Sequence, residues 1–262
     1  DLELRYFNID RDKQSIIPFI RAAQKYNPEL TFWTSPWCPP SWMKITGDYP
    51  VLSSKFNHMP EKMNYILYGN VNDKVDPDEM KLVGRRGDKF PRQLATTDYF
   101  IQDPRYLQAY ANYFCKFIDA YKEQGVNIDM VIYQNEAYSY TPYPGCAWTA
   151  EGTVRFNRDY LGPTLRQKHP EVKLYLGTFN TNRVVYVQKI ASDTKLQEYV
   201  SGMAFQWEGR ESLPVLRKEH PEWNYMCSES ECGRGSFDWG AGEHTFELMN
   251  HYLGNGCNEY TF

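Results

Sequence analysis

Asp129-Met-Val-Ile-Tyr-Gln-Asn-Glu136 combines a short apolar run with an abrupt polar end. Residues 130–133 are apolar or β-branched and long enough for one buried strand, and Gln134, Asn135 and Glu136 follow directly. In a parallel α/β barrel the carboxyl ends of the strands surround the active site. A carboxylic acid there is a candidate general acid or base, and Asn135 is placed to hydrogen-bond a substrate hydroxyl.

A second stretch, Trp223-Asn-Tyr-Met-Cys-Ser-Glu229, has the same character. Either glutamate alone is equally well an ordinary residue at the start of a solvated loop. Two strands of one sheet that each end in Glu favour a paired-carboxylate site, because glycoside hydrolysis needs two such groups. Glu231 is an alternative partner; we prefer Glu229 because the strand-like residues 225–228 run directly into it.

Strand-like and helical patterns alternate along the chain. The predicted strands are 2–7, 31–34, 128–133, 172–177, 202–206, 224–228 and one from 257, and the predicted helices are 16–26, 103–125, 149–168, 183–196, 213–220 and 242–253. This rhythm indicates a parallel sheet, and its length favours a (β/α)₈ TIM barrel over an open doubly wound sheet. Because the first and last strands run to the chain ends, we expect the barrel to be incomplete at both ends.

One domain of 262 residues with 42% hydrophobic content is long enough to bury a single large core, so we expect residues 1–262 to form one catalytic barrel. Residues 46–97 are long, polar and only weakly periodic. A stretch of this kind inside a compact domain is usually a functional loop or a disordered one. We therefore predict a loop insertion near the active site.

Several classes of function are disfavoured. The net charge of −4 and the dispersed Lys and Arg residues give no basis for binding nucleic acid, and no apolar run approaches the roughly 20 residues of a membrane span. The five histidines avoid the strand ends, which disfavours a histidine metal site or a Ser/His/Asp site, and phosphate-binding glycine motifs are missing, so no cofactor is expected. The six cysteines are expected to be mostly buried thiols. A disulfide is left open among the four that fall near predicted strand ends, Cys38, Cys146, Cys227 and Cys232; the other two are Cys115 and Cys257.

Further side chains are expected at the same rim of the barrel. The aromatic share of 16% tilts toward carbohydrate, because aromatic faces stack on sugar rings. Arg5 is either the cation that keeps a nucleophilic carboxylate ionised or a rim salt bridge. Glu208 is expected mainly to bind substrate or stabilise structure. The remaining candidates for substrate binding are Trp37, Tyr138, Trp148, Gln206 and Trp207.

Several motifs, taken in order, resemble those of glycoside hydrolase family 30. They are Ser35-Pro-Trp37, Gln134-Asn-Glu136, the runs 143–152 and 160–165, and Ser228-Glu-Ser-Glu-Cys-Gly233. The family includes glucosylceramidases and microbial endo-β-1,6-glucanases. The resemblance implies a retaining mechanism on a (β/α)₈ barrel, a small β-sandwich side domain expected outside this chain, and a secreted, periplasmic or cell-surface location.

By the same resemblance Glu136 is the acid/base, Glu229 the nucleophile, and Arg5, Trp37 and Asn135 occupy sugar-binding positions. Animal-type glucosylceramidases carry His-Trp-Tyr where this chain has Gln206-Trp-Glu208, so the chain resembles the bacterial β-glucanase-like branch more closely.

The predicted function is therefore retaining hydrolysis of a β-linked glucan, with 1,6-linked glucan first. Glucosylceramidase, β-xylosidase and β-galactanase are alternatives within the family. A non-catalytic carbohydrate-binding barrel and a structural fragment are alternatives of other classes.

Overall fold

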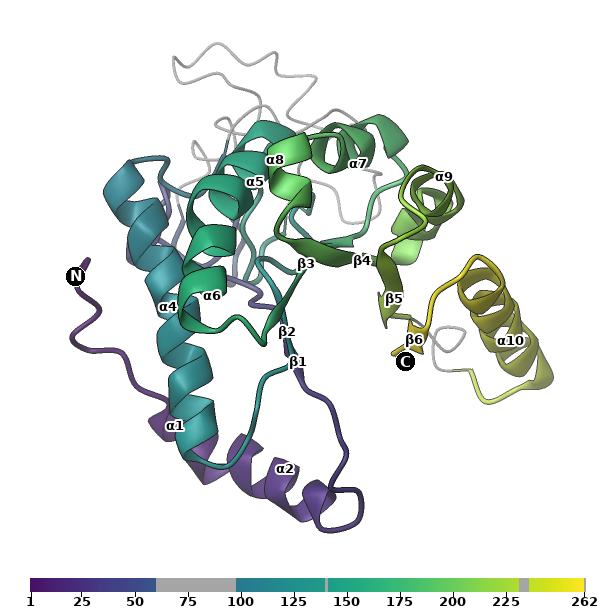
Figure 1. Ribbon diagram of the computed structural model, residues 1–262, viewed down its shortest axis with the longest axis horizontal. Coiled ribbons are helices and arrows are strands. Elements are labelled where there is room, and N and C mark those ends of the chain that lie inside the picture. The colour runs from purple at the N-terminus through teal and green to yellow at the C-terminus, as the bar shows by residue number, and fades with distance from the viewer. Residues whose placement is uncertain (60–97, 140, 231–235, 262) are drawn as a thin grey trace.

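Six parallel strands form one sheet in the computed structural model, which describes residues 1–59, 98–139, 141–230 and 236–261 (Figure 1). Each strand pairs with the next one along the chain, so the order in the sheet is the order in the sequence. The strands are β1 (Trp33–Thr34), β2 (Met130–Ile132), β3 (Lys173–Phe179), β4 (Val200–Gln206), β5 (Asn224–Glu229) and β6 (Glu259–Tyr260). Sequential parallel strands joined by helical segments are the arrangement of a (β/α)₈ barrel.

Helices form a layer outside the sheet, with α4 at the β1 end and α10 at the β6 end in Figure 1. The α-helices are α1 (Asp10–Gln14), α2 (Ile16–Gln24), α4 (Pro104–Glu123), α5 (Ala150–Phe156), α6 (Gly162–Lys168), α7 (Val184–Ala191), α8 (Thr194–Gln197), α9 (Leu213–Glu219) and α10 (Trp239–Gly254). The 3₁₀ turns η1 (Ser41–Met43) and η4 (Trp207–Glu211) follow β1 and β4, and the π-helical turn η3 (Asn157–Leu161) joins α5 to α6. The predicted helix 149–168 is thus one continuous helical segment with a π turn inside it.

Helix α4 shows how local sequence sets an element. The Asp103 carboxylate accepts a hydrogen bond from the Arg105 backbone N–H, and Pro104 occupies the first helical position. Leu107, Tyr110 and Phe114 lie on the face that packs into the core, as the periodicity predicted.

The sheet has one small inner core and larger outer ones. Met130, Ile132, Tyr175, Ala204 and Met226 pack together on one face, which is the barrel interior. Intervening strand residues belong to the two larger clusters that include the helices. Because side chains alternate along a strand, the interior face continues past Ile132 to Gln134 and past Ala204 to Gln206. The strand ends therefore carry polar groups into the barrel mouth.

The predicted strand 2–7 is wrong. Residues in this stretch form turns: Leu4 has a φ of 53°, its N–H binds the Asp1 carbonyl, and the Phe7 N–H binds the Leu4 carbonyl. Alternating apolar residues produced the expectation, and local turn bonds replace the ladder bonds it required. The described residues therefore hold six strands where the sequence predicted seven.

Residues 60–97 of the predicted insertion lie outside the described residues. The part before them runs beside the loop that follows β2. Pro50 forms an antiparallel bridge with Pro144, and the Val51 and Leu52 N–H groups both donate to the Thr141 carbonyl. The described part of the segment therefore lies next to a strand-end loop, and the insertion near the active site stays a prediction.

The five cysteines that the structure describes are free thiols; Cys232 lies outside the described residues. Across the described ranges, no helix is both long enough and apolar enough to cross a lipid bilayer.

Candidate active site

Glu136 and Glu229 lie close together at the barrel mouth. Glu136 follows β2 and Glu229 ends β5, with β3 and β4 between them as the sequence predicted. The Gln206 side-chain nitrogen, Nε2, donates to Glu136 Oε1 at 3.2 Å and to Glu229 Oε2 at 3.3 Å. One amide group therefore bridges the two carboxylates.

This shared donor limits the distance between the two acids. The N–H bonds of a planar amide diverge by about 120°, so two acceptors at these distances that each take one N–H lie roughly 5 to 6 Å apart. Two carboxylates at that spacing suit chemistry in which one gives a proton while the other attacks from the opposite side.

Two irregularities in the sheet aim side chains into the site. Phe205 pairs with Cys227, but the next residue, Gln206, pairs with Glu229, so Ser228 is the extra residue of a bulge. A second register shift lies between Leu176 and Phe179 of β3. Regular alternation would have put Glu229 on the helix side of the sheet, and the bulge brings it opposite Gln206.

Glu136 is held by a network from β3 and its own loop. Its backbone, at a φ of 47°, is in the left-handed region that costs energy for a residue with a side chain, and its N–H donates to Thr178 Oγ1 at 3.0 Å. Ser139 Oγ donates to Glu136 Oε2 at 2.9 Å and accepts from Asn180 Nδ2 at 2.5 Å. Each Glu136 carboxylate oxygen thus has a donor.

Asn135 is fixed beside Glu136. Its N–H donates to the Pro36 carbonyl at 2.8 Å, and its Oδ1 accepts from Thr178 Oγ1 at 3.0 Å. Its Nδ2 is buried and has no hydrogen-bond partner among the described residues. An amide donor without a partner is suited to bind a ligand oxygen, as the sequence predicted for this residue.

The pKa of Glu229 is affected by the neighbouring acid. Burial raises the pKa of Glu229, the negative charge of Glu136 raises it further, and the hydrogen bond from Gln206 opposes both. The pKa of Tyr143 is raised by burial and then by the charges of Glu136 and Glu229, so this phenol faces the same pair.

Aromatic rings stand at the edge of the pair. The Trp37 ring lies 5.9 Å from the Tyr143 ring, and both side chains are exposed. These rings offer a stacking surface close to the two carboxylates, which suits the apolar face of a sugar.

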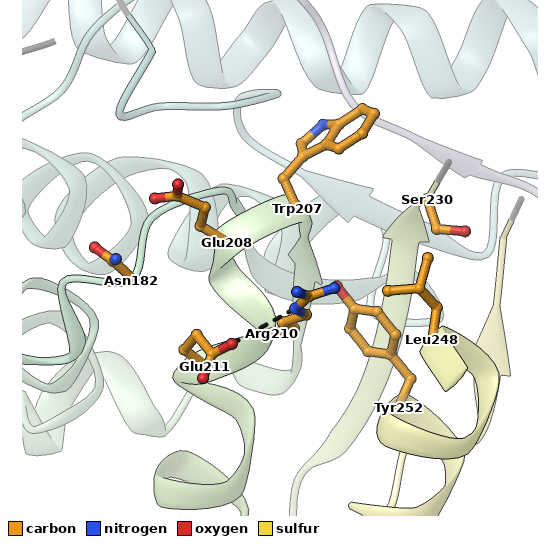
Figure 2. Close-up of a pocket in the computed structure, with 8 residues that line it drawn as sticks. All are labelled: Asn182, Trp207, Glu208, Arg210, Glu211, Ser230, Leu248 and Tyr252. Carbon is orange, nitrogen blue, oxygen red and sulfur yellow. Dashed lines mark ion pairs between the residues drawn. The ribbon is translucent and has the colours of Figure 1, made fainter. Parts of the chain in front are cut away.

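A pocket of about 500 Å³ is lined in part by the residues that directly follow Gln206 and Glu229 (Figure 2). Trp207 directly follows Gln206, and Ser230 directly follows Glu229, so the pocket begins where both strands end. Its lining is Asn182, Trp207, Glu208, Arg210, Glu211, Ser230, Leu248 and Tyr252. Arg210 Nε pairs with Glu211 Oε1 at 3.5 Å. The exposed Trp207 indole offers an apolar face, and the polar side chains around it offer hydrogen-bonding groups.

Two predicted site residues are not part of this arrangement. Arg5 is exposed on an N-terminal turn, where its Nε lies 3.3 Å from Asp1 and 3.6 Å from Glu3. Of the two roles predicted for Arg5, a cation beside the nucleophile or a salt bridge, the structure shows a salt bridge. The predicted strand that would have brought Arg5 near the nucleophile does not form. Trp148 is fully buried and packs 4.9 Å from the Phe100 ring, so it belongs to the core and is closed to substrate.

Tyr138 and Glu208 have intermediate positions. Tyr138 is half-buried and its ring lies 5.0 Å from the Tyr186 ring, which gives it a packing role. Glu208 lines the pocket that includes Trp207 and Ser230. Glu231 lies outside the described residues, so the preference for Glu229 rests on its hydrogen bond from Gln206 and on its electrostatic interaction with Glu136.

Sequence reasoning missed several polar residues of the site: Ser139, Thr178, Asn180 and Ser228. Thr178 and Asn180 come from the end of β3, where Gly177-Thr-Phe-Asn180 has the same change from apolar to polar seen after β2. That change was a usable signal. Ser139 and Ser228 carried none, because their roles depend on a loop and a bulge. No group of three potential metal ligands occurs among the residues that the structure describes.

Sequence relatives support one family. Lysosomal acid glucosylceramidase of Mus musculus is 28% identical over 254 residues, covering 91% of this chain and 40% of that protein. Endo-1,6-beta-D-glucanase neg1 of Aspergillus fumigatus is 25% identical over 206 residues, covering 78% of this chain and 35% of that protein. This chain therefore spans well under half the length of these relatives.

Solved structures share the fold. The endo-beta1,6-glucanase BT3312 superposes with a TM-score of 0.68 at 21% identity, covering 97% of this chain and 51% of that one. SrfJ from Salmonella typhimurium superposes with a TM-score of 0.70 at 19% identity, covering 99% of this chain and 50% of that one.

The model of the glycosyl hydrolase family 30 TIM-barrel domain matches residues 1–55 and 100–255. The unmatched gap nearly coincides with the predicted insertion 46–97. The six parallel strands in sequential order agree with that barrel. The chain belongs to glycosyl hydrolase family 30.

Proposed function

We propose that this chain carries the catalytic centre of a retaining β-glycosidase that cleaves β-linked glucan, with 1,6-linked glucan as the first choice. The single observation that carries the proposal is the bridge from Gln206 to both Glu136 and Glu229. The resulting carboxylate spacing is close to the about 5–5.5 Å of retaining enzymes and shorter than the about 6.5–9.5 Å of inverting ones.

In the first step Glu229 attacks the anomeric carbon and Glu136 protonates the departing glycosidic oxygen. A covalent glycosyl–Glu229 ester forms as the old glycosidic bond breaks. In the second step Glu136, now ionised, takes a proton from water, the water oxygen bonds to the anomeric carbon, and the ester bond to Glu229 breaks. The enzyme returns to its starting protonation state.

The pair can hold one proton and one charge at the same time. Repulsion from ionised Glu136 raises the pKa of Glu229, so protonation of Glu136 removes that repulsion. The first step needs the state in which Glu136 carries the proton and Glu229 is ionised. Gln206 donates to both carboxylates, and its hydrogen bond to Glu229 opposes the rise in the pKa of that acid.

The choice of a β-glucan rests on relatives and on the barrel mouth. Two sequence relatives are named endo-1,6-beta-D-glucanases, one from Aspergillus fumigatus and one from Neurospora crassa. Gln206-Trp-Glu208 departs from the His-Trp-Tyr of animal-type glucosylceramidases, and the pocket beyond Trp207 is lined mainly by polar side chains. Glucosylceramide is the second candidate, supported by the 28% identity to the mouse lysosomal enzyme.

The test compares the wild-type protein with Glu136→Ala and Glu229→Ala. The substrates are β-1,6-glucan, β-xylan, glucosylceramide and an aryl β-glucoside, followed by release of reducing ends or aglycone. We expect cleavage of β-1,6-glucan by the wild type, and a loss of several orders of magnitude in kcat in either variant.

Azide separates the two roles. With the activated aryl glucoside, azide should restore turnover of Glu136→Ala and give a β-glycosyl azide, and with Glu229→Ala it should give the α-anomer. Full activity of Glu229→Ala would reject this assignment in favour of Glu231. A wild-type protein that binds the glucan without cleaving any substrate would instead support the carbohydrate-binding barrel.

A further inference from the structure

We propose that Gln206 is a positioning residue that holds the carboxylates of Glu136 and Glu229 at their working separation, rather than a residue that binds substrate. This inference rests on the proposed function, since it assigns a role within that same site. It replaces the substrate-binding role that the sequence suggested for Gln206.

The first argument is that Gln206 has no donor left for a sugar. A glutamine side chain offers two N–H donors. One is used by Glu136 Oε1 and the other by Glu229 Oε2. The side chain is also fully buried, so a sugar hydroxyl reaches it only by displacing one of the two acids.

The second argument is that the amide is oriented from behind. Ser228 Oγ donates to Gln206 Oε1 at 2.9 Å, and Ser228 is itself buried. This bond keeps the carbonyl end toward β5 and the NH₂ end toward the two carboxylates. The opposite orientation would turn an acceptor oxygen toward two anions, which repel it.

The third argument comes from the strands. The bulge at Ser228 places Glu229 directly opposite Gln206, while Ser228 remains within reach of the amide oxygen. The same irregularity thus provides both the acid and the residue that orients its donor. Trp207, next along the chain, has a φ of 51°, so the backbone turns out of the sheet immediately after Gln206.

An amide in this position has a chemical consequence. It does not titrate, so its donors remain available throughout the pH range in which the two glutamates exchange a proton. Hydrogen bonds to a carboxylate favour the ionised form. Removing the hydrogen bond to Glu229 should raise the pKa of that carboxyl and move the acidic limb of activity to higher pH.

The test uses Gln206→Met, which keeps the length of the side chain and removes both donors, and Ser228→Ala, which removes only the orienting hydroxyl. Both are assayed on a glucan that the wild type cleaves, with kcat and KM measured from about pH 3 to pH 9. Gln188→Met, a glutamine on the outer helix α7, is the matched control and should leave the profile unchanged.

We expect Gln206→Met to lose roughly 100-fold in kcat, the scale reported for loss of one well-placed donor or a misplacement of about 1 Å, with little change in KM. Its acidic limb should shift upward in pH. Ser228→Ala should show the same changes, smaller in size. A Gln206→Met variant with raised KM, unchanged kcat and an unmoved pH profile would overturn the proposal and restore the substrate-binding role.

A measurement without turnover separates this inference from the proposed function. The glutamate carboxyl carbons are titrated by ¹³C NMR in wild type and in both variants, with melting curves to establish folding. If no substrate is cleaved but the pKa of Glu229 rises in Gln206→Met, the positioning role stands and the proposed function fails. If that pKa does not move in either folded variant, the positioning role is rejected whatever the activity. Should Gln206→Met not fold, Ser228→Ala decides by the same titration.

Discussion

Glu229 shows how a single side chain can be destabilising where it is useful. It is half-buried next to a second acid, and both burial and the charge of Glu136 raise its pKa. Acids with perturbed pKa values concentrate at functional sites, because catalysis needs a pKa matched to its task. The burial and the neighbouring charge that shift the pKa also weaken the fold. Glu136 adds a left-handed backbone to the same small region.

The raised pKa gives a pH-dependent stability. A carboxyl whose pKa is higher in the folded than in the unfolded state costs stability when the pH is above both values. That cost disappears as the pH falls through the folded value to below the ordinary 4.5. Glu229→Gln removes the charge, so we expect a Tm at pH 7 that is higher than wild type by up to a few °C.

The measurement is thermal unfolding at several pH values. The advantage of Glu229→Gln should shrink as the pH falls toward about 4. Glu247→Gln, which replaces an exposed acid on α10, is the control and should shift Tm little at any pH. A Glu229→Gln protein that is less stable than wild type at pH 7, or whose advantage is the same at pH 4, would contradict this account.

Trp37 and Trp148 looked alike at the level of single residues, since both follow a predicted strand within a proline-containing segment. The structure separates them completely: Trp37 is 46% exposed near the two acids, and Trp148 is 0% exposed in the core. Composition therefore identifies an aromatic-rich protein, and only packing identifies which rings a sugar can touch.

At the scale of elements, a buried lysine joins the two loops that frame the site. Lys44 ends the turn η1, is 2% exposed, and donates from Nζ to the carbonyls of Tyr49, Pro50 and Gly145, each at 2.8 Å. Gly145 belongs to the loop after β2 that carries Tyr143. One ammonium group thus fixes the segment after β1 against the segment after β2.

Lys44→Met should therefore be strongly destabilising. It keeps most of the aliphatic volume but removes the donor to the Pro50 and Gly145 carbonyls, while the Tyr49 carbonyl still accepts from the Gly145 N–H. We expect a loss of about 3 kcal/mol in the free energy of unfolding. Denaturant unfolding measures it. Lys13→Met, at an exposed ion pair on α1, is the control and should change stability by less than about 0.5 kcal/mol. Equal effects of the two substitutions would show that the Pro50 and Gly145 carbonyls find other donors.

Strand β3 supplies a site residue, Thr178, that the sequence did not predict, and an irregularity in its pairing with β4 explains why. One of its two register shifts with β4 lies between Leu176 and Phe179, and Gly177 within it has a φ of 84°. A Cβ at Gly177 would lie 2.6 Å from the Ala204 carbonyl oxygen, so glycine permits this approach to β4. Thr178 then reaches Asn135 and Glu136.

At the scale of the whole molecule, the four strands that carry the site are also those packed on both faces. β2 to β5 lie between the small interior cluster and the helical layer, while β1 and β6 are two-residue strands at the ends of the sheet. The site is therefore built on the rigid part of the described fold.

Amide hydrogen exchange should reflect this arrangement. We expect the amides of β3 and β4 to be the most protected, those of β6 and of α1 to exchange much faster, and the protection of β2 and β5 to be lost together with that of β3. Exchange followed by mass spectrometry or NMR tests it. Uniformly weak protection across β2 to β5 would support the alternative that this chain is a structural fragment without a stable core.

Much of the architecture was predictable because its signals are local. Alternating strand and helix patterns gave the parallel order, Asp103-Pro104 gave the start of α4, and the apolar runs before Glu136 and Glu229 gave the strands that carry them. The prediction of a strand at 2–7 was wrong because alternation of apolar residues does not show whether a neighbouring strand is present to form the ladder of hydrogen bonds. The predicted helix 183–196 divides into α7 and α8 because Asp193 caps a new start.

The sequence by itself determined the strand order and the two glutamates at strand ends, since both follow from periodicity and from the place where an apolar run stops. The tertiary structure alone decided which side chains share the site. It excluded Arg5 and Trp148 and brought in Thr178, Ser139 and Ser228. It also turned Glu229 toward Gln206 through a bulge. These outcomes depend on register and packing between segments far apart in the chain. A local sequence pattern carries no information about those contacts.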